Sequence, residues 1–287
     1  MIYKYDVNMI YQSIKVIVDN LITTAKANEN NKNDLLWVLL DGHYYPNRQY
    51  SQPAGTSNFE IHDLDNLIPR QTHFKFIRDY YLKRQIDEKI ELGNDLKENL
   101  GKMEYAESLV HYEMLLYLKI WEMDFVWTCL YQLLQLSKGN QYNWYLKVVT
   151  SKKDSLNRAI LNTDTAIYKT KNDLRNEIKI SGSEISRFID AVFIKNMRNA
   201  IAHSQFGLSN MTISLSNDSD TKSVNFDDWS KNYFAKTIIF YKVFEEALGN
   251  ELEKYKIEAK ASNGLNCVLG DGTTRTMNYT EFWSYKI

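Results

Sequence analysis

Proline is confined to one short part of this chain. Its three prolines, Pro46, Pro53 and Pro69, are followed by 218 residues (287 minus 69) that contain none. Because proline disrupts the interior of helices and of central strands, its absence permits long regular elements after residue 69. The prolines share their region with glycine, asparagine and serine, which favours an irregular connection from Gly42 to Arg70.

Apolar side chains recur at helical spacing through most of the remaining sequence, as Ile10, Ile14 and Leu21 do near its start. This pattern predicts helices over residues 7–27, 74–100, 105–136, 142–160, 165–180, 184–203 and 227–256. Ser183 is the expected N-cap of the sixth of these helices. The short apolar run 35–40 fits either a strand or a buried helical turn, and its periodicity does not decide between them.

Two stretches alternate between apolar and polar residues instead. Residues 211–215 and 223–226 flank a run of asparagine, aspartate and serine, which predicts a small β-hairpin. We therefore expect an all-α protein in the main, with this hairpin inserted after the helix 184–203. The expected organisation is an N-terminal accessory helical region at 1–100, a helical domain at 101–260, and a C-terminal tail of short strands and turns at 261–287.

The charge balance limits the partners that the whole surface could attract. Lysine and arginine number 35 against 36 acidic residues, so a nucleic-acid site would have to be a local patch. Cys129 and Cys267 carry no partner motif, which favours reduced thiols and a cytoplasmic location. The start of the sequence does not resemble a signal peptide, and charges interrupt the most apolar segment, 114–136, so we expect no membrane span.

The sequence lacks the patterns typical of common zinc sites and phosphate-binding loops. The two cysteines are 138 residues apart (267 minus 129), so no zinc-binding cluster of cysteine and histidine is present. Neither of the glycine-rich phosphate-binding patterns, G-x-x-x-x-G-K-[ST] and G-x-G-x-x-G, occurs. We therefore expect no metal site and no cofactor.

One segment combines residues suited to phosphodiester chemistry. Arg198, Asn199 and His203 form the pattern R-N-x-x-x-H at the end of the predicted helix 184–203. Asn199 and His203 are four residues apart, so the amide could bond the imidazole and fix its tautomer. Arg198 lies about 140° from His203 around an ideal helix, which favours a composite site built across two protomers. Ile194 and Ile201 share the sector of Arg198 and form a plausible dimer seam.

This pattern resembles the R-x4-6-H signature of the HEPN superfamily, and the resemblance extends over about residues 105–250. It implies a HEPN-like helical bundle and a homodimeric, metal-independent endoribonuclease in which the 2′-hydroxyl of RNA attacks the adjacent phosphodiester. Arg198, Asn199 and His203 would be the catalytic residues: His203 would move the proton, Arg198 would hold the phosphate and Asn199 would orient His203. Ser204 and Lys195 would contact the substrate.

The resemblance also implies a biological setting. Similar HEPN proteins are bacterial toxins or antiviral abortive-infection effectors, so an antitoxin or another defence-system partner is expected. Some of these toxins are silenced by adenylylation of a tyrosine two residues beyond the motif histidine. This chain has Gln205 at that position, which puts that mode of control in doubt.

Two alternatives remain open from the sequence. His203 falls on the same helical stripe as Ile185 and Val192, so it could be a structural histidine, hydrogen-bonded in the core. A HEPN-like domain could also bind nucleotide, RNA or protein without cleaving it. The acidic residues of the apolar helix are interpreted as its solvated face, with ion pairing to Arg198 or Arg187 as the alternative; they are Glu113, Glu122 and Asp124.

Overall fold

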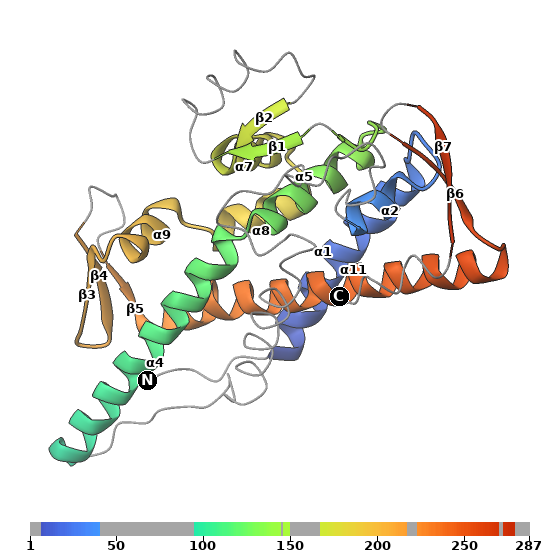
Figure 1. The fold of residues 1–287 in the computed structure, drawn as a ribbon. Helices are drawn as coiled ribbons and strands as arrows, with labels where there is room; N and C mark the ends of the chain where they lie inside the picture. The colour runs from blue at the N-terminus through green and yellow to red at the C-terminus, as the bar shows by residue number, and fades with distance from the viewer. Residues whose placement is uncertain are drawn as a thin grey trace. The chain divides into compact units, whose positions relative to one another are not determined.

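A computed structural model describes residues 7–40, 95–144, 146–149, 167–216, 223–269 and 272–278 (Figure 1). Helices account for 69% of the interpretable residues, which confirms a mainly α-helical protein. The irregular connection predicted at 42–70 and nearly all of the helix predicted at 74–100 lie outside the described residues. Within the described part of the chain, none of the helices has the length and apolarity that a membrane span needs.

The helices of the described residues follow one another through the chain with short strands between them. They are α1 (Val7–Ala27), α2 (Asp34–Leu39), α4 (Leu96–Glu122), α5 (Asp124–Ser137), α7 (Lys171–Ile180), α8 (Glu184–Val192), α9 (Lys195–Ala202), α10 (Phe226–Asp228), the π-helical η2 (Trp229–Phe234) and α11 (Ala235–Ala261). The strands are β1 (Leu146–Val149), β2 (Ile167–Thr170), β3 (Phe206–Ser209), β4 (Thr212–Leu215), β5 (Ser223–Asn225), β6 (Leu265–Val268) and β7 (Thr274–Met277).

Several predicted elements are confirmed. Helix α1 has the predicted bounds. Of the two alternatives for the run 35–40, the buried helical turn is confirmed, because residues 35–39 lie in α2 and all side chains of α2 are buried. Ser183 caps α8 as expected, because its hydroxyl accepts the backbone N–H of Ser186 at 3.3 Å. The predicted helix 227–256 corresponds to the consecutive segments α10, η2 and α11.

Two predicted long helices are broken in the structure. The helix expected at 105–136 ends at Glu122, because the backbone of Met123 is extended (φ −68°, ψ 118°) before α5 begins. The helix expected at 184–203 is interrupted at Phe193 and Ile194, where Ile194 is again extended (φ −104°, ψ 110°). Helical spacing of apolar residues continues across both breaks, so the sequence pattern alone did not reveal them.

The strands form three small sheets. β1 and β2 pair in parallel, so the helices predicted at 142–160 and 165–180 are wrong where these strands lie. The predicted hairpin is confirmed as the antiparallel pair β4–β5, and β3 adds a third strand beside β4. Asn210 and Met211 both have positive φ in the two-residue turn between β3 and β4, as a type I′ turn requires. The tail forms the antiparallel pair β6–β7.

The chain divides into two compact units, and each collects three separate stretches. Among the described residues, the first unit contains 7–15, 95–122 and 187–243, and the second contains 16–40, 123–186 and 244–278, with the gaps given above. These units are interleaved along the sequence. The domain bounds expected at 1–100, 101–260 and 261–287 stay a prediction.

Aromatic side chains form the core of the first unit. Trp121 of α4 stacks on Phe240 of α11, with ring centroids 5.9 Å apart, and its indole N–H donates to the Thr237 hydroxyl at 3.2 Å. Tyr117 lies one turn earlier on α4 and contacts Trp229 of η2 edge-on at 5.1 Å. The first part of α11 and the segment η2 therefore pack against the C-terminal half of α4.

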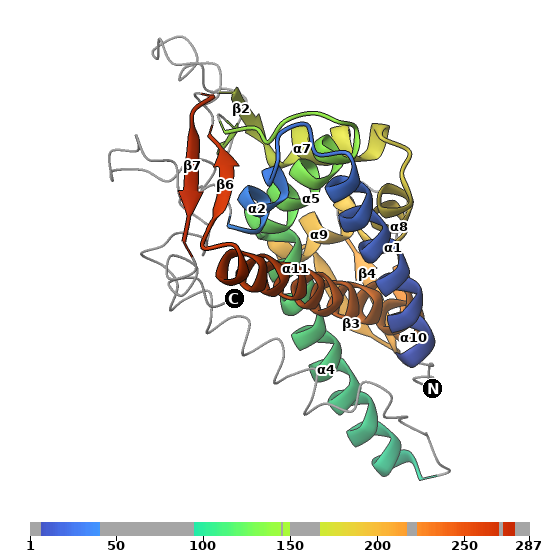
Figure 2. The same cartoon turned by 90° about the vertical axis from the view of Figure 1, so that its right-hand side faces the viewer.

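The second unit contains α2, α5, α7 and the strand pairs β1–β2 and β6–β7. The indole N–H of Trp37 on α2 donates to the carbonyl of Val268 on β6 at 3.0 Å, and Figure 2 shows this helix beside that strand. Asn33 precedes α2 and donates from its side-chain amide to the carbonyl of Asn266, also on β6. These two bonds fix the C-terminal hairpin to α2.

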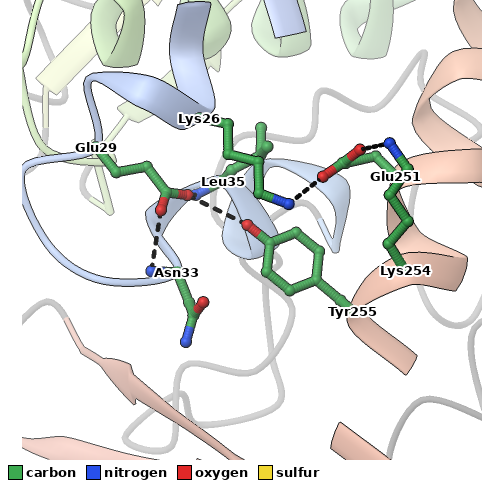
Figure 3. A network of polar contacts seen from close by, with 7 residues as sticks. All are labelled: Lys26, Glu29, Asn33, Leu35, Glu251, Lys254 and Tyr255. Carbon is green, nitrogen blue, oxygen red and sulfur yellow. Dashed lines mark hydrogen bonds and ion pairs between the residues drawn. The ribbon is translucent and has the colours of Figure 1, made fainter. Parts of the chain in front are cut away.

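A carboxylate from the loop before α2 satisfies the first N–H groups of that helix (Figure 3). Glu29 accepts the backbone N–H of Leu35 at 2.7 Å and that of Asn33 at 3.2 Å, and the hydroxyl of Tyr255 donates to it at 3.3 Å. Burial raises the pKa of Glu29 above its ordinary value. Nearby, Glu251 of α11 accepts from Lys26 and Lys254, which holds α1 to α11 within this unit.

Candidate functional site

The break between α8 and α9 is held by one buried hydroxyl of α4. Tyr117 donates to the carbonyl of Val192 at 3.0 Å and accepts the backbone N–H of Ile194 at 3.0 Å. Its side chain is completely buried, and burial raises its pKa above the ordinary range, so the hydroxyl stays neutral. This hydroxyl replaces the helical bonding that the chain loses at the break, and it sets where α9 begins.

The end of α9 has a tight C-cap without glycine. The backbone N–H of Gln205 donates to the carbonyl of Ala200 at 2.8 Å, and that of Ser204 donates to the carbonyl of Ile201 at 3.3 Å. This pair of bonds is a Schellman motif, which places Ser204 at the position where glycine is usual. Ser204 has φ 54°, in the left-handed region, and His203 is the C-cap.

His203 is exposed to solvent. Among the described residues, its imidazole has no hydrogen-bond or ion-pair partner. The alternative that His203 is a hydrogen-bonded core histidine is therefore wrong, because α9 is separated from α8 and no longer continues the stripe of Ile185 and Val192. The expected bond from Asn199 to the imidazole is also not formed within the described part of the chain.

Arg198 is held from two sides. One of its terminal nitrogens pairs with the carboxylate of Glu122, and the other donates to Oδ1 of Asn199 at 2.8 Å. A charged guanidinium is a strong hydrogen-bond donor, which explains why the Asn199 oxygen faces Arg198. Glu122 is therefore a partner of Arg198, and its interpretation as part of a solvated helix face is wrong.

The apolar strip of Ile194 and Ile201, predicted as a dimer seam, is not exposed as expected. Ile201 is only 5% exposed, because α9 turns this side chain into the first unit, and Ile194 is half-buried. Ile194 and Ile201 therefore do not offer an apolar strip to a second protomer. The expectation of a homodimer stays a prediction that needs another contact surface.

The two predicted substrate contacts lie at opposite ends of α9. Lys195 is the first residue of this helix, and Ser204 follows its C-cap; both are exposed. Lys195 and His203 are eight residues apart, which corresponds to about 12 Å along a helix axis. The structure thus places Ser204 beside His203 and keeps Lys195 away from it.

Sequence reasoning missed the residues of α4 that support this site. Tyr117 and Glu122 reach α9 from more than 70 positions away, and no local pattern connects them with the motif. Glu113, also on α4, is buried and accepts from the indole of Trp229 at 3.0 Å and the hydroxyl of Ser230 at 3.1 Å. Its interpretation as part of a solvated face is likewise wrong.

The described residues outside α9 give little that competes with this site. No three histidine, cysteine, aspartate or glutamate side chains gather there in a way that could hold a metal ion. Burial raises the pKa of the Cys267 thiol to about 12, so this thiol does not supply a thiolate nucleophile at neutral pH. Comparison with protein-family models, with curated proteins and with solved structures gives no match for this chain.

Proposed function

We propose that this chain is a metal-independent endoribonuclease in which His203 moves the proton and Arg198 binds the phosphate. The observation that carries the proposal is the imidazole of His203, which is exposed at the end of α9 and bonded to no described residue. An imidazole that is exposed and free of structural bonds is accessible to a substrate and can serve as a general base or general acid. The family resemblance of the R-N-x-x-x-H pattern supports the same roles.

The reaction is an attack of the RNA 2′-hydroxyl oxygen on the adjacent phosphorus. His203 takes the 2′-hydroxyl proton as the new P–O bond forms, and the P–O5′ bond breaks. The leaving 5′ oxygen takes a proton from an imidazolium, so the products are a 2′,3′-cyclic phosphate and a 5′-hydroxyl. Arg198 donates hydrogen bonds to the phosphate oxygens as negative charge builds on them.

The proposed assembly is a homodimer with a composite active site. On an ideal helix, Arg198 and His203 would be about 140° apart around the axis and about 7.5 Å apart along it, which favours a site shared by two chains. A second copy would bring its own histidine towards the arginine of the first. Ser204 extends this site beside His203 as a phosphate contact.

Cleavage of a labelled single-stranded RNA in the presence of a metal chelator tests the proposal. We expect the wild type to yield ends with 2′,3′-cyclic phosphate, and His203→Ala to lose about 100- to 10,000-fold in rate. Arg198→Ala should lose a similar factor while remaining folded. His111→Ala is the matched control, because His111 is another exposed histidine of the first unit and contacts Phe206 edge-on at 5.5 Å. A wild type that does not cleave RNA, or a fully active His203→Ala variant, refutes the proposal.

One observation favours a second candidate, a non-catalytic HEPN-like module that binds RNA, nucleotide or protein. The charge of Arg198 is already paired with Glu122, as expected if this arginine only stabilises the fold. This candidate predicts RNA binding or protein binding without any cleaved product.

The proposed biological role is that of a bacterial toxin or antiviral defence effector that acts with an antitoxin or another defence-system partner. Expression of the wild type in a bacterial culture should then arrest growth, whereas His203→Ala should not. Equal growth of both cultures, with equal protein levels, contradicts a toxic nuclease.

A further inference from the structure

The guanidinium of Arg198 is fixed before any ligand arrives. Of its five N–H groups, one bonds the carboxylate of Glu122 and one bonds Oδ1 of Asn199. Its Nε is buried and has no partner among the described residues. An anion can therefore approach this guanidinium only through the hydrogens that remain on its two terminal nitrogens.

The position of Glu122 is not explained by the stability of its own helix. Glu122 is the last residue of α4, and Met123 leaves the helix immediately afterwards. A carboxylate at the C-terminal end of a helix is disfavoured by the helix dipole. The ion pair with Arg198, 76 positions further along the chain (198 minus 122), offsets this unfavourable placement.

We infer that Glu122 is a positioning residue, which with Asn199 holds the Arg198 guanidinium in the orientation that receives the phosphate. This inference rests on the proposed function. A side chain fixed by two acceptors loses little further freedom when the substrate binds, and small errors in the placement of such a group are costly for the rate. Glu122 touches no substrate and acts through Arg198.

The carboxylate has two properties that substitutions can separate, its reach and its charge. Glu122→Gln keeps the reach and one oxygen acceptor but removes the charge. Glu122→Asp keeps the charge but withdraws the carboxylate by one methylene. The side chains of Arg198 and Glu122 are 26% and 31% exposed, so water screens the attraction between them. Removing the negative charge of Glu122 should therefore lower kcat less than shortening its side chain does.

Steady-state cleavage of one RNA by the two Glu122 variants tests the inference. Glu122→Gln should keep kcat within about threefold and lower KM by about two- to tenfold, because a negative charge near the phosphate is gone. Glu122→Asp should lower kcat by about 10- to 100-fold, because Arg198 is no longer held in place. A purely structural ion pair would instead leave kcat unchanged in both variants while lowering their melting temperatures.

The same two substitutions are repeated in an Arg198→Ala background. If Glu122 acts through Arg198, neither substitution changes the residual rate by more than about twofold there. Wild-type kcat for Glu122→Asp, or a further loss in the Arg198→Ala background, overturns the inference and leaves the proposed nuclease intact. A wild type without cleavage, or an active Arg198→Ala variant, overturns the proposed function and this inference with it.

Discussion

The hydroxyl of Tyr117 should be worth several kilocalories per mole, although it is a single oxygen atom. Tyr117→Phe leaves the ring, its contact with Trp229 and the packing volume in place. It removes both hydrogen bonds at the break between α8 and α9, one to the carbonyl of Val192 and one from the N–H of Ile194. The substitution therefore isolates the polar contribution of one buried group.

The expected loss follows from the burial of the two backbone groups that would remain. Val192 is completely buried, so its carbonyl would lose its partner without access to water. Ile194 is half-buried, and water could restore part of its bond. With about 1–3 kcal/mol for each unsatisfied group, we expect Tyr117→Phe to lower the free energy of unfolding by about 2–4 kcal/mol.

Urea unfolding followed by tryptophan fluorescence measures this loss, because Trp121 and Trp229 both contact the Tyr117 ring. Tyr112→Phe is the matched control: it makes the same substitution on the same helix, at a residue that is 58% exposed. Its effect should stay within about 0.5 kcal/mol. Equal effects of the two substitutions, or a loss below about 0.5 kcal/mol for Tyr117→Phe, would refute the reasoning.

Two further predictions concern stability. Ser204→Gly should raise the free energy of unfolding by up to about 1 kcal/mol, because glycine tolerates the left-handed backbone of the α9 cap, while Ser204→Ala should not; thermal melts compare them, and equal melting temperatures count against strain at this position. If the Ser204 hydroxyl contacts phosphate, both variants should weaken RNA binding. Burial raises the pKa of Glu29 in the folded chain, so its contribution to stability is fully present below the unfolded value and is lost as the pH rises through the folded value. The stability of the wild type relative to Glu29→Gln should therefore decline in urea titrations as the pH rises above the ordinary glutamate pKa of 4.5, and a constant difference would contradict this assignment.

The sequence predicted the elements whose signals are local. Helix α1 has a continuous apolar stripe, the strands β4 and β5 alternate around a polar turn, and the hydroxyl of Ser183 is three residues from the N–H that it caps. In each case the residues that decide the structure are neighbours in the chain, so their spacing alone carries the information.

The elements that escaped prediction depend on distant contacts. The interruption at Phe193 and Ile194 is stabilised by Tyr117, and β1 and β2 are four-residue strands that only their mutual pairing defines. Such short segments contain too few residues for a period to be recognised.

The candidate site shows the same limit. The pattern of Arg198, Asn199 and His203 identified the segment, but it did not reveal that the helix is interrupted at Phe193 and Ile194, nor that His203 is exposed at the C-cap of α9. Arg198 forms an ion pair with Glu122, and because the two residues are far apart in the chain, no local spacing predicts this contact.

The division of the chain has a consequence for how it can fold during synthesis. The first unit needs residues 187–243, and the third stretch of the second unit begins only at residue 244. A ribosome that adds about 5–20 residues per second would release most of the chain before either hydrophobic core could close. Until those later residues emerge, the core-facing side chains of α4 and α5 lack part of their partners, and exposed apolar surface of this kind is prone to aggregation.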